Sequence, residues 1–274
     1  NGVVSSIPMP EALVERIYES MDKGLDFMPL IKMWTRWLRN PVLRTKMKKG
    51  WGREFSERFF NYINLKYVHP QLKNQLMEEQ GLSEEVAERR ATMYQMKITK
   101  EGLLNGYKVS TEVLTKFETD EDGECQEVPR YKRTFNVDTG EIESEGLPEH
   151  VEDRLFQPAI MGTGGDAFFC EGSNGYDKPN HFIRVGCTHR LPDWSYVNTN
   201  DRMSCVKGLH FGGLEYINCI SGEIHNIFVD PMHIGAVPDD ETGAARCLQY
   251  FVHSSLAGVN GSIYHSSTYA AKTD

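Results

Sequence analysis

Four residues that can bind a transition metal lie close together in the sequence. They are Cys170, His181, Cys187 and His189, and thiolate and imidazole groups are the ligands that zinc prefers. Structural zinc sites usually take two closely spaced pairs of ligands that are separated by a longer loop. Here only Cys187 and His189 form such a pair. The spacing therefore favours a buried thiol and ordinary loop histidines, and zinc remains an alternative.

A histidine flanked by glycines is the second candidate for a chemical role. His210 lies in the run Gly208-Leu209-His210-Phe211-Gly212, with Glu215 shortly after it. Together with Tyr107 these side chains are candidates for a catalytic or nucleotide-binding site, in a layout analogous to that of the ADP-ribosyltransferases, which use NAD. No glutamate at the end of a late strand supports that chemistry. The favoured interpretation is structural, with His210 bonded to a buried carbonyl, and the chain is expected not to be an enzyme.

A basic segment from 32 to 66 is the third signal. It holds ten basic and two acidic residues, a charge of +8, so the rest of a chain of net charge -9 carries -17. Such a local concentration predicts a localised anionic partner. The candidate surface residues are Arg36, Arg39, Arg44, Lys46, Lys48, Lys49 and Arg53.

Three tryptophans, Trp34, Trp37 and Trp51, lie among these bases. Basic and indole side chains together suit an anionic membrane surface, and they also suit phosphates and stacked bases of a nucleic acid. In the simplest alternative Trp34 and Trp37 face the core and the bases form a solvated face. An anionic membrane, a nucleic acid and an acidic protein all remain open as partners.

The elements that must position these residues change in type near residue 96. Before it, apolar residues at helical spacing predict helices over about 10–24, 26–39, 53–66 and 83–94, with Asn40-Pro41 and His69-Pro70 as stops. After it, a turn at 98–102 leads into a strand, and alternating apolar residues predict the others. The expected strands are 103–109, 130–135, 182–185, 223–229, 236–238 and 245–252. Loops are expected at 119–123, 138–149 and 162–175.

These patterns predict an α+β fold in which a helical N-terminal region, 1–95, packs on an antiparallel-sheet module, 96–253, followed by an extended tail, 254–274. No apolar run is long enough to span a bilayer, and the first ten residues lack the basic start and apolar stretch of a secretory signal. The six cysteines show no tight spacing, which favours reduced thiols over disulfides.

The segment around His210 resembles the rIIB-like family of tailed bacteriophages. That family carries a "C-S-x-G-L-H-V-G-x-x-E-Y" signature, then "V-x-P-x-x-V-x-x-V-P-x-D", then a basic residue that opens a last strand. This chain matches the two signatures at Cys205, Gly208, Leu209, His210, Gly212, Glu215, Tyr216, Pro231, Val237, Pro238 and Asp239, and Arg246 lies where the basic residue is expected. The helix that ends at Asn40-Pro41 and the turn and strand from Ile98 to Val109 resemble further family motifs, in the same order.

The chain departs from the family pattern in three places. Phe211 takes the place of a small β-branched residue, and Gly106 takes the place of an alanine. The region 154–199 is longer than usual, so any function located there is specific to this chain.

The resemblance implies a phage accessory protein without an assigned catalytic activity. Family members are associated with lysis timing and with protection of the infection against exclusion by prophages. They act in the host cytoplasm near the inner face of the membrane, beside a larger rIIA partner. Self-association is the other expected interaction. The alternatives from other classes are a nucleotide- or NAD-binding module and a structural or nucleic-acid-associated oligomeric component.

Overall fold

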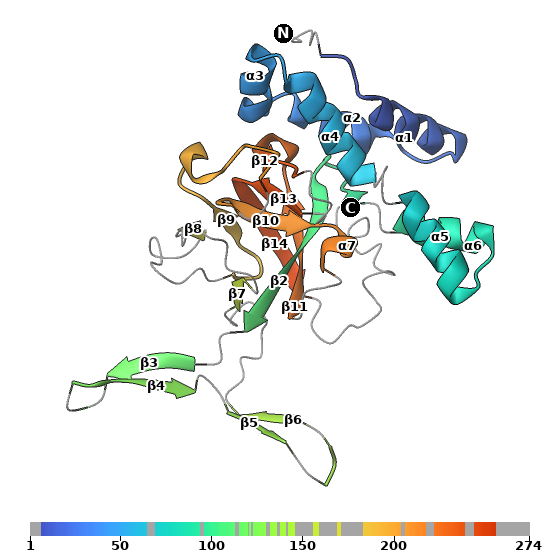
Figure 1. Ribbon diagram of the computed structural model, residues 1–274. Coiled ribbons are helices and arrows are strands. Elements are labelled where there is room, and N and C mark those ends of the chain that lie inside the picture. Colours follow the sequence, from blue (N-terminus) through green and yellow to red (C-terminus); the bar gives the residue numbers. More distant parts are fainter. Residues whose placement is uncertain are drawn as a thin grey trace.

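The structure is a computed structural model whose fold is α+β, as the sequence predicts (Figure 1). Helices form the N-terminal part. An antiparallel sheet, whose strands do not follow the order of the sequence, forms the C-terminal part. The residues that the structure describes are 7–64, 69–93, 96–112, 115–119, 121, 123–129, 132–135, 138–140, 142–145, 156–158, 169–170, 183–203, 206–217, 222–238 and 244–255.

Six helices precede the sheet within the described residues. They are α1 Glu11–Asp22, α2 Met28–Trp37, α3 Pro41–Lys48, α4 Gly52–Asn64, α5 His69–Gln80 and α6 Glu84–Met93. The four predicted helices are confirmed with slightly shorter bounds. Helices α3 and α5 were not predicted, because Asn40-Pro41 and His69-Pro70 were interpreted only as stops. Proline is equally suited to the first turn of a helix, where its missing N–H has no partner to lose.

The helical part is held by an aromatic core between α2 and α4. The indole of Trp37 is fully buried and stacks on Phe59, with ring centroids 4.2 Å apart. Its Nε1 donates to the Ser56 hydroxyl at 2.9 Å, so the polar edge of the ring is satisfied. Trp34 packs against Phe60 at 5.7 Å. The prediction that Trp34 and Trp37 face the core is confirmed.

The main sheet has the strand order β12-β13-β10-β2-β11-β14-β9-β8, with β1 and β7 also paired to β2. All its pairs are antiparallel. Its strands are β1 Lys97–Ile98, β2 Leu104–Glu112, β7 Phe156–Pro158, β8 Phe169–Cys170, β9 Thr188–Arg190, β10 Leu209–Gly212, β11 Glu223–Val229, β12 Ile234–Ala236, β13 Ala244–Cys247 and β14 Gln249–Ser255.

Two hairpins form separate two-stranded sheets, which lie away from the main sheet in Figure 1. They are β3 Thr115–Thr119 with β4 Cys125–Pro129, and β5 Lys132–Phe135 with β6 Ile142–Glu145. Three short helical segments complete the described part: η2 Trp194–Tyr196, α7 Leu214–Ile217 and η3 Pro231–His233.

Several strand predictions are confirmed and several are wrong in detail. The strand 223–229 is β11 with the same bounds, and Gly102, with φ of +80°, makes the turn before β2. The expected strand 245–252 is two strands, β13 and β14, separated at Leu248. The strand at 236–238 lies earlier, at β12, and 182–185 contributes only a bridge between Ile183 and Phe156. The expected loops 138–149 and 162–175 contain β6 and β8, because strands of four and two residues are too short to show a clear alternation.

Strand β10 lies beside β2, with Gly212 opposite Tyr107. The tail residues 254–255 belong to β14, and 256–274 lie outside the described residues.

The helices and the sheet share one hydrophobic core and are joined by Asn40. Asn40 is fully buried, and its Oδ1 accepts from the Val42 and Leu43 amides, which caps α3. Its Nδ2 donates to the carbonyls of Pro231 at 3.0 Å and Ile234 at 2.8 Å. One amide group therefore starts a helix and attaches it to the sheet. Nearby, Arg36 donates to the Glu101 carbonyl and pairs with Asp230.

We predict that Asn40→Ala lowers the free energy of unfolding by about 3 kcal/mol. It removes an N-cap, worth about 1 kcal/mol, and leaves two buried carbonyls without their donor, at about 1 kcal/mol each. The measurement is urea denaturation followed by circular dichroism. Asn40→Ser is the matched variant, because its hydroxyl can still cap α3 whereas the carbonyls of Pro231 and Ile234 lose the amide donor. A loss below 0.5 kcal/mol for Asn40→Ala would contradict this account.

Candidate functional site

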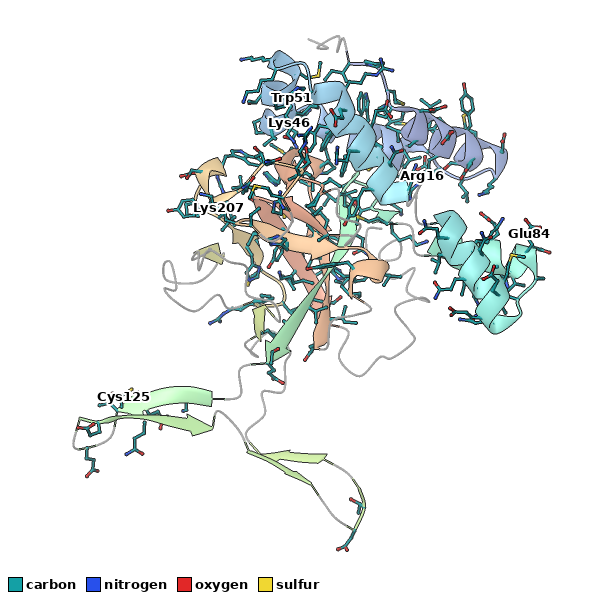
Figure 2. The ribbon with its side chains drawn as sticks, viewed as in Figure 1. Arg16, Lys46, Trp51, Glu84, Cys125 and Lys207 are labelled. Carbon is teal, nitrogen blue, oxygen red and sulfur yellow. The ribbon has the colours of Figure 1, made fainter. Side chains whose placement is uncertain are left out.

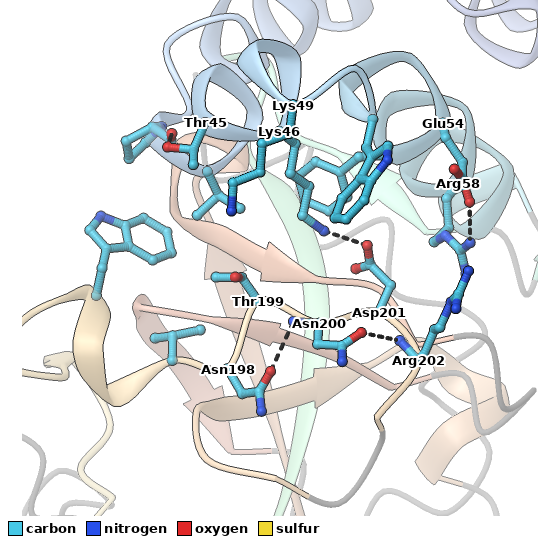
Figure 3. A pocket seen from close by; sticks show the side chains of 16 residues that line it. Thr45, Lys46, Lys49, Glu54, Arg58, Asn198, Thr199, Asn200, Asp201 and Arg202 are labelled. Carbon is cyan, nitrogen blue, oxygen red and sulfur yellow. Dashed lines mark hydrogen bonds and ion pairs between the residues drawn. The ribbon is translucent and has the colours of Figure 1, made fainter.

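A pocket of about 840 Å³ lies between the α3–α4 helices and the loop that follows η2 (Figure 3). One wall comes from the basic segment and the other from the C-terminal part of the region 154–199 and the residues after it. The lining residues are Pro41, Val42, Thr45, Lys46, Lys49, Trp51, Glu54, Phe55, Arg58, Trp194, Val197, Asn198, Thr199, Asn200, Asp201 and Arg202.

An ion pair between Lys46 and Asp201 links the two walls (Figure 3). The Lys46 ammonium also lies 3.8 Å from the centre of the Phe55 ring, a cation–π contact. Burial lowers the pKa of Lys46, and the Asp201 carboxylate opposes that shift. The other oxygen of Asp201 accepts from the Val237 amide at 3.0 Å, so this carboxylate is fixed by both the helices and the sheet.

The loop wall is fixed from beneath by Arg246 on β13. This side chain is fully buried, and its guanidinium donates to the carbonyls of Asn198 at 3.0 Å, Asn200 at 2.7 Å and Met203. All three carbonyls therefore accept from the same guanidinium. The loop 198–203 is therefore held in a single shape by hydrogen bonds to a charged donor, which are stronger than neutral ones.

Gly208 makes room for the aliphatic part of the Arg246 side chain. Its φ is +138°, and a Cβ there would lie 3.2 Å from the Cδ of Arg246. Residues with a side chain rarely adopt such a backbone angle. The glycine of the signature and the basic residue of the last strand therefore act together, and their role is structural.

The pocket combines an apolar floor with an excess of positive charge. Phe55, Val42 and Val197 are buried on the floor, whereas Trp51 is 61% exposed. The lining includes four cations, Lys46, Lys49, Arg58 and Arg202, against the carboxylates of Glu54 and Asp201, which gives a net charge of +2. Arg58 pairs with Glu54 at 3.1 Å. Such a surface suits an anion that also carries an apolar or planar group.

Burial separates the basic residues predicted for the surface into two groups. Arg36 and Lys46 are partly buried and pair with Asp230 and Asp201 respectively, so their charges are already balanced by carboxylates. The other five, Arg39, Arg44, Lys48, Lys49 and Arg53, are exposed. None of the five makes an ion pair within the part of the chain that the structure describes. We call these five residues, with the exposed Trp51, the cationic face; Trp51 and Lys46 mark its location in Figure 2.

The catalytic candidates His210 and Tyr107 lie on neighbouring strands, outside the pocket lining. Leu209 and Phe211 are buried on one side of β10, and His210, on the other side, is only partly buried, which is the alternation that the sequence predicts. Burial raises the pKa of Tyr107 to about 12, and its hydroxyl accepts from the Asn105 amide at 3.3 Å. The side chain of Glu215 lies outside the described residues. A catalytic role for the three stays a prediction.

Phe211 and Gly106, the two departures from the family pattern, lie in contact. A Cβ on Gly106 would lie 2.6 Å from Cδ2 of the Phe211 ring, far inside contact distance. The large ring on β10 therefore occupies the space that an alanine methyl on β2 would need. The two departures compensate for each other in volume.

Lys108 is a partly buried cation beside β10. Its Nζ donates to the His210 carbonyl at 3.0 Å, and burial lowers its pKa to about 8. The thiol of Cys247, fully buried nearby, has its pKa raised by the same cause. Both groups therefore titrate away from their ordinary ranges, in opposite directions.

The four metal candidates do not meet as a set within the described residues. Cys170 lies opposite His189 in the β8–β9 pair, and the Cys187 thiol is free. His189 is fully buried, accepts from the Arg184 amide at 3.1 Å and stacks on Tyr250. His181 lies outside the described residues. Among the described ones, no three histidine, cysteine or carboxylate residues are grouped as a metal site would require.

The sequence alone does not predict the pocket, because its two walls are 155 residues apart at Lys46 and Asp201. The run Asn198-Thr199-Asn200-Asp201 is the signal available, since such residues fold short turns through their own side chains. Here Asn198 accepts from the Asn200 amide, and Asn200 accepts from the Arg202 amide. Nothing in the run indicates which helix it faces.

No protein-family model, curated protein or solved structure matches this chain. None of the helices in the described ranges is long and apolar enough to cross a membrane.

The contact between Gly106 and Phe211 predicts a specific coupling. Gly106→Ala should lower the free energy of unfolding by about 1–3 kcal/mol through overpacking. Phe211→Val should lower it by a similar or larger amount through the cavity it leaves. The double variant should be at least about 1 kcal/mol more stable than the sum of the two losses predicts. Urea denaturation of the four proteins measures this coupling, and strict additivity would show that the contact does not constrain the sequence.

Lys108 and Cys247 predict how stability changes between pH 8 and 9.5. The folded-state pKa of Lys108, about 8, lies below the ordinary 10.5, so the unfolded chain binds more protons in this range and Lys108 makes stability rise with pH. Cys247 has a raised pKa, so the unfolded chain loses its proton first and Cys247 makes stability fall with pH. Each slope is at most about 1.4 kcal/mol per pH unit.

We therefore expect the free energy of unfolding of Lys108→Met to fall with rising pH relative to that of the unmodified protein. The free energy of unfolding of Cys247→Ala should rise with pH relative to the same reference. Urea denaturation at pH 7.5, 8.5 and 9.5 makes the comparison, in which all other titrating groups are shared. Parallel curves for the three proteins would contradict the assignment.

Proposed function

We propose that this protein is a non-enzymatic binding protein that associates with an anionic membrane surface through its cationic face. The observation that carries the proposal is the sorting of the basic segment. Trp34 and Trp37 lie in the core, and Arg36 and Lys46 pair with carboxylates, whereas Trp51 and the other five candidate surface residues are exposed.

The chemistry of the cationic face supports this choice. Each Lys or Arg near an anionic bilayer contributes about 1 kcal/mol of attraction. Indole rings prefer the interface between headgroups and acyl chains, where the ring is apolar and its N–H is hydrated. Trp51 is 61% exposed, which is unusual for so large a ring in water. Arg44 and Lys48 are one helical turn apart on α3, so they face the same side.

The resemblance to the rIIB-like family supports the same location. It implies an accessory protein of phage infection that acts in lysis timing or in protection against exclusion, at the inner face of the host membrane. A larger partner of the rIIA type, or a second copy of the chain, would complete that role. Gly208, Arg246 and Asn40 match motifs of the family and have structural roles in this protein. Because these roles stabilise the fold and involve no catalytic chemistry, they support a binding module.

We predict that the protein binds anionic vesicles of phosphatidylglycerol and phosphatidylethanolamine at low salt, and not vesicles of phosphatidylcholine. Reversal of three exposed charges, Arg44→Glu, Lys48→Glu and Lys49→Glu, should lower vesicle partitioning by about 100-fold or more. Lys46 is left intact, because its pairing with Asp201 supports the fold. The readout is co-sedimentation at increasing salt, which should weaken binding.

The matched control reverses the same number of exposed charges elsewhere, with Lys23→Glu, Arg89→Glu and Lys207→Glu. It should retain binding apart from a small general effect of net charge. An absence of vesicle binding at low salt, or an equal loss in the control, would overturn the proposal. Tighter binding to single-stranded DNA or RNA than to vesicles, lost in the same α3 variant, would assign the cationic face to nucleic acid instead.

A further inference from the structure

We propose that the pocket between α3–α4 and the loop 198–202 binds a nucleoside phosphate. This site is distinct from the membrane contact, although Lys49 and Trp51 border both. It is also distinct from the strands that carry His210 and Tyr107. The lining supplies what this class of ligand requires: positive charge, flat apolar surface and directed hydrogen-bond donors.

The size and position of the pocket fit a small organic ligand. A volume of about 840 Å³ lies within the range of roughly 300–1,000 Å³ typical of ligand sites. Such sites occur preferentially where two packed regions meet. Here the helical region and the sheet module supply one wall each, and the Lys46–Asp201 ion pair crosses the space between them (Figure 3).

Two cations are available to the phosphate. Lys46 and Arg58 are already paired with Asp201 and Glu54. Lys49 and Arg202 are exposed at the opening, and neither forms an ion pair with any residue that the structure describes. Lys49 is the C-cap residue of α3 and Arg202 comes from the loop, so each wall supplies one cation that can pair with an anion.

The indoles and the floor are suited to the base. Trp51 and Trp194 line the pocket with much of Trp51 uncovered, and Phe55, Val42 and Val197 form the apolar surface between the walls. Every nucleobase has a flat π-face, so it can stack on such rings whichever hydrogen-bond donors and acceptors the base carries. Asn200 orients a donor as well: its Oδ1 is taken by the Arg202 amide, which leaves Nδ2 to face solvent or a ligand acceptor.

Simpler ligands satisfy only part of this surface. Inorganic phosphate would use Lys49 and Arg202 and leave the apolar floor and the rings wet. A neutral apolar molecule would cover the floor and leave two cations without a counter-charge. A nucleoside phosphate joins the two requirements in one molecule of suitable size.

The test is isothermal titration calorimetry with ATP, AMP and NAD⁺, with adenosine and inorganic phosphate as partial ligands. Intrinsic fluorescence gives a second readout, because two of the four tryptophans line the pocket and the other two are buried in the core. We expect saturable binding and quenching by at least one nucleotide, and at least 10-fold weaker binding of adenosine and of phosphate. Trp194→Phe should remove part of the quenching and keep the fold.

Arg202→Gln and Lys48→Gln separate this pocket from the cationic face. Both remove one exposed charge, but only Arg202 lines the pocket. Arg202→Gln should weaken nucleotide binding about 10-fold and leave vesicle binding unchanged, and Lys48→Gln should do the reverse. No binding of any nucleotide, phosphate binding as tight as nucleotide binding, or equal losses in both variants would each overturn the assignment. Failure of vesicle binding alone would leave it standing.

Discussion

The guanidinium of Arg246 is the constraint on which the candidate site depends. A buried charge is costly unless hydrogen bonds replace its water, and three carbonyls of the loop 198–203 do so. The same bonds give the loop its shape, and with it the position of Asp201. Asp201 then holds Lys46, and Lys46 holds α3. A series of contacts thus runs from β13 in the sheet to helix α3. Each contact in it is a hydrogen bond or an ion pair.

The residues shared with the rIIB-like signature gain a physical meaning from this arrangement. Gly208 is required by the space that Arg246 fills, and Asn40 is required because one amide must cap α3 and bind two carbonyls near η3. Phe211 and Gly106 show the same logic in reverse, since two unusual residues are compatible only with each other. The signature describes how two parts of the protein are joined. The pocket is lined from both sides, by residues of 41–58 and by Trp194 and residues 197–202.

Sequence reasoning reached the fold class, the core tryptophans and β11 because these depend on local periodicity. The run from Glu223 to Val229 alternates, and Trp34 and Trp37 share a helical stripe, so neighbours in the sequence decide the outcome. Helix α3 was missed because Pro41 ends one helix and starts the next, and only the cap made by Asn40 tells the two roles apart. The pocket was beyond reach for another reason. Lys46 is partly buried because it contacts Asp201, which lies 155 residues away in the sequence. Local spacing of residues cannot predict so distant a contact.

Helix α3 presents opposite sides to two different environments. Lys48 belongs to the cationic face, Lys46 turns inward to Asp201, and Lys49 lies at the border between them. Eight residues of one rigid element therefore connect the pocket and the outer surface. If occupancy of either location moves that helix, the two equilibria are linked, and thermodynamic reciprocity makes the influence equal in both directions. A short helix that is capped by Asn40 and paired with Asp201 would then couple a small ligand to a large surface.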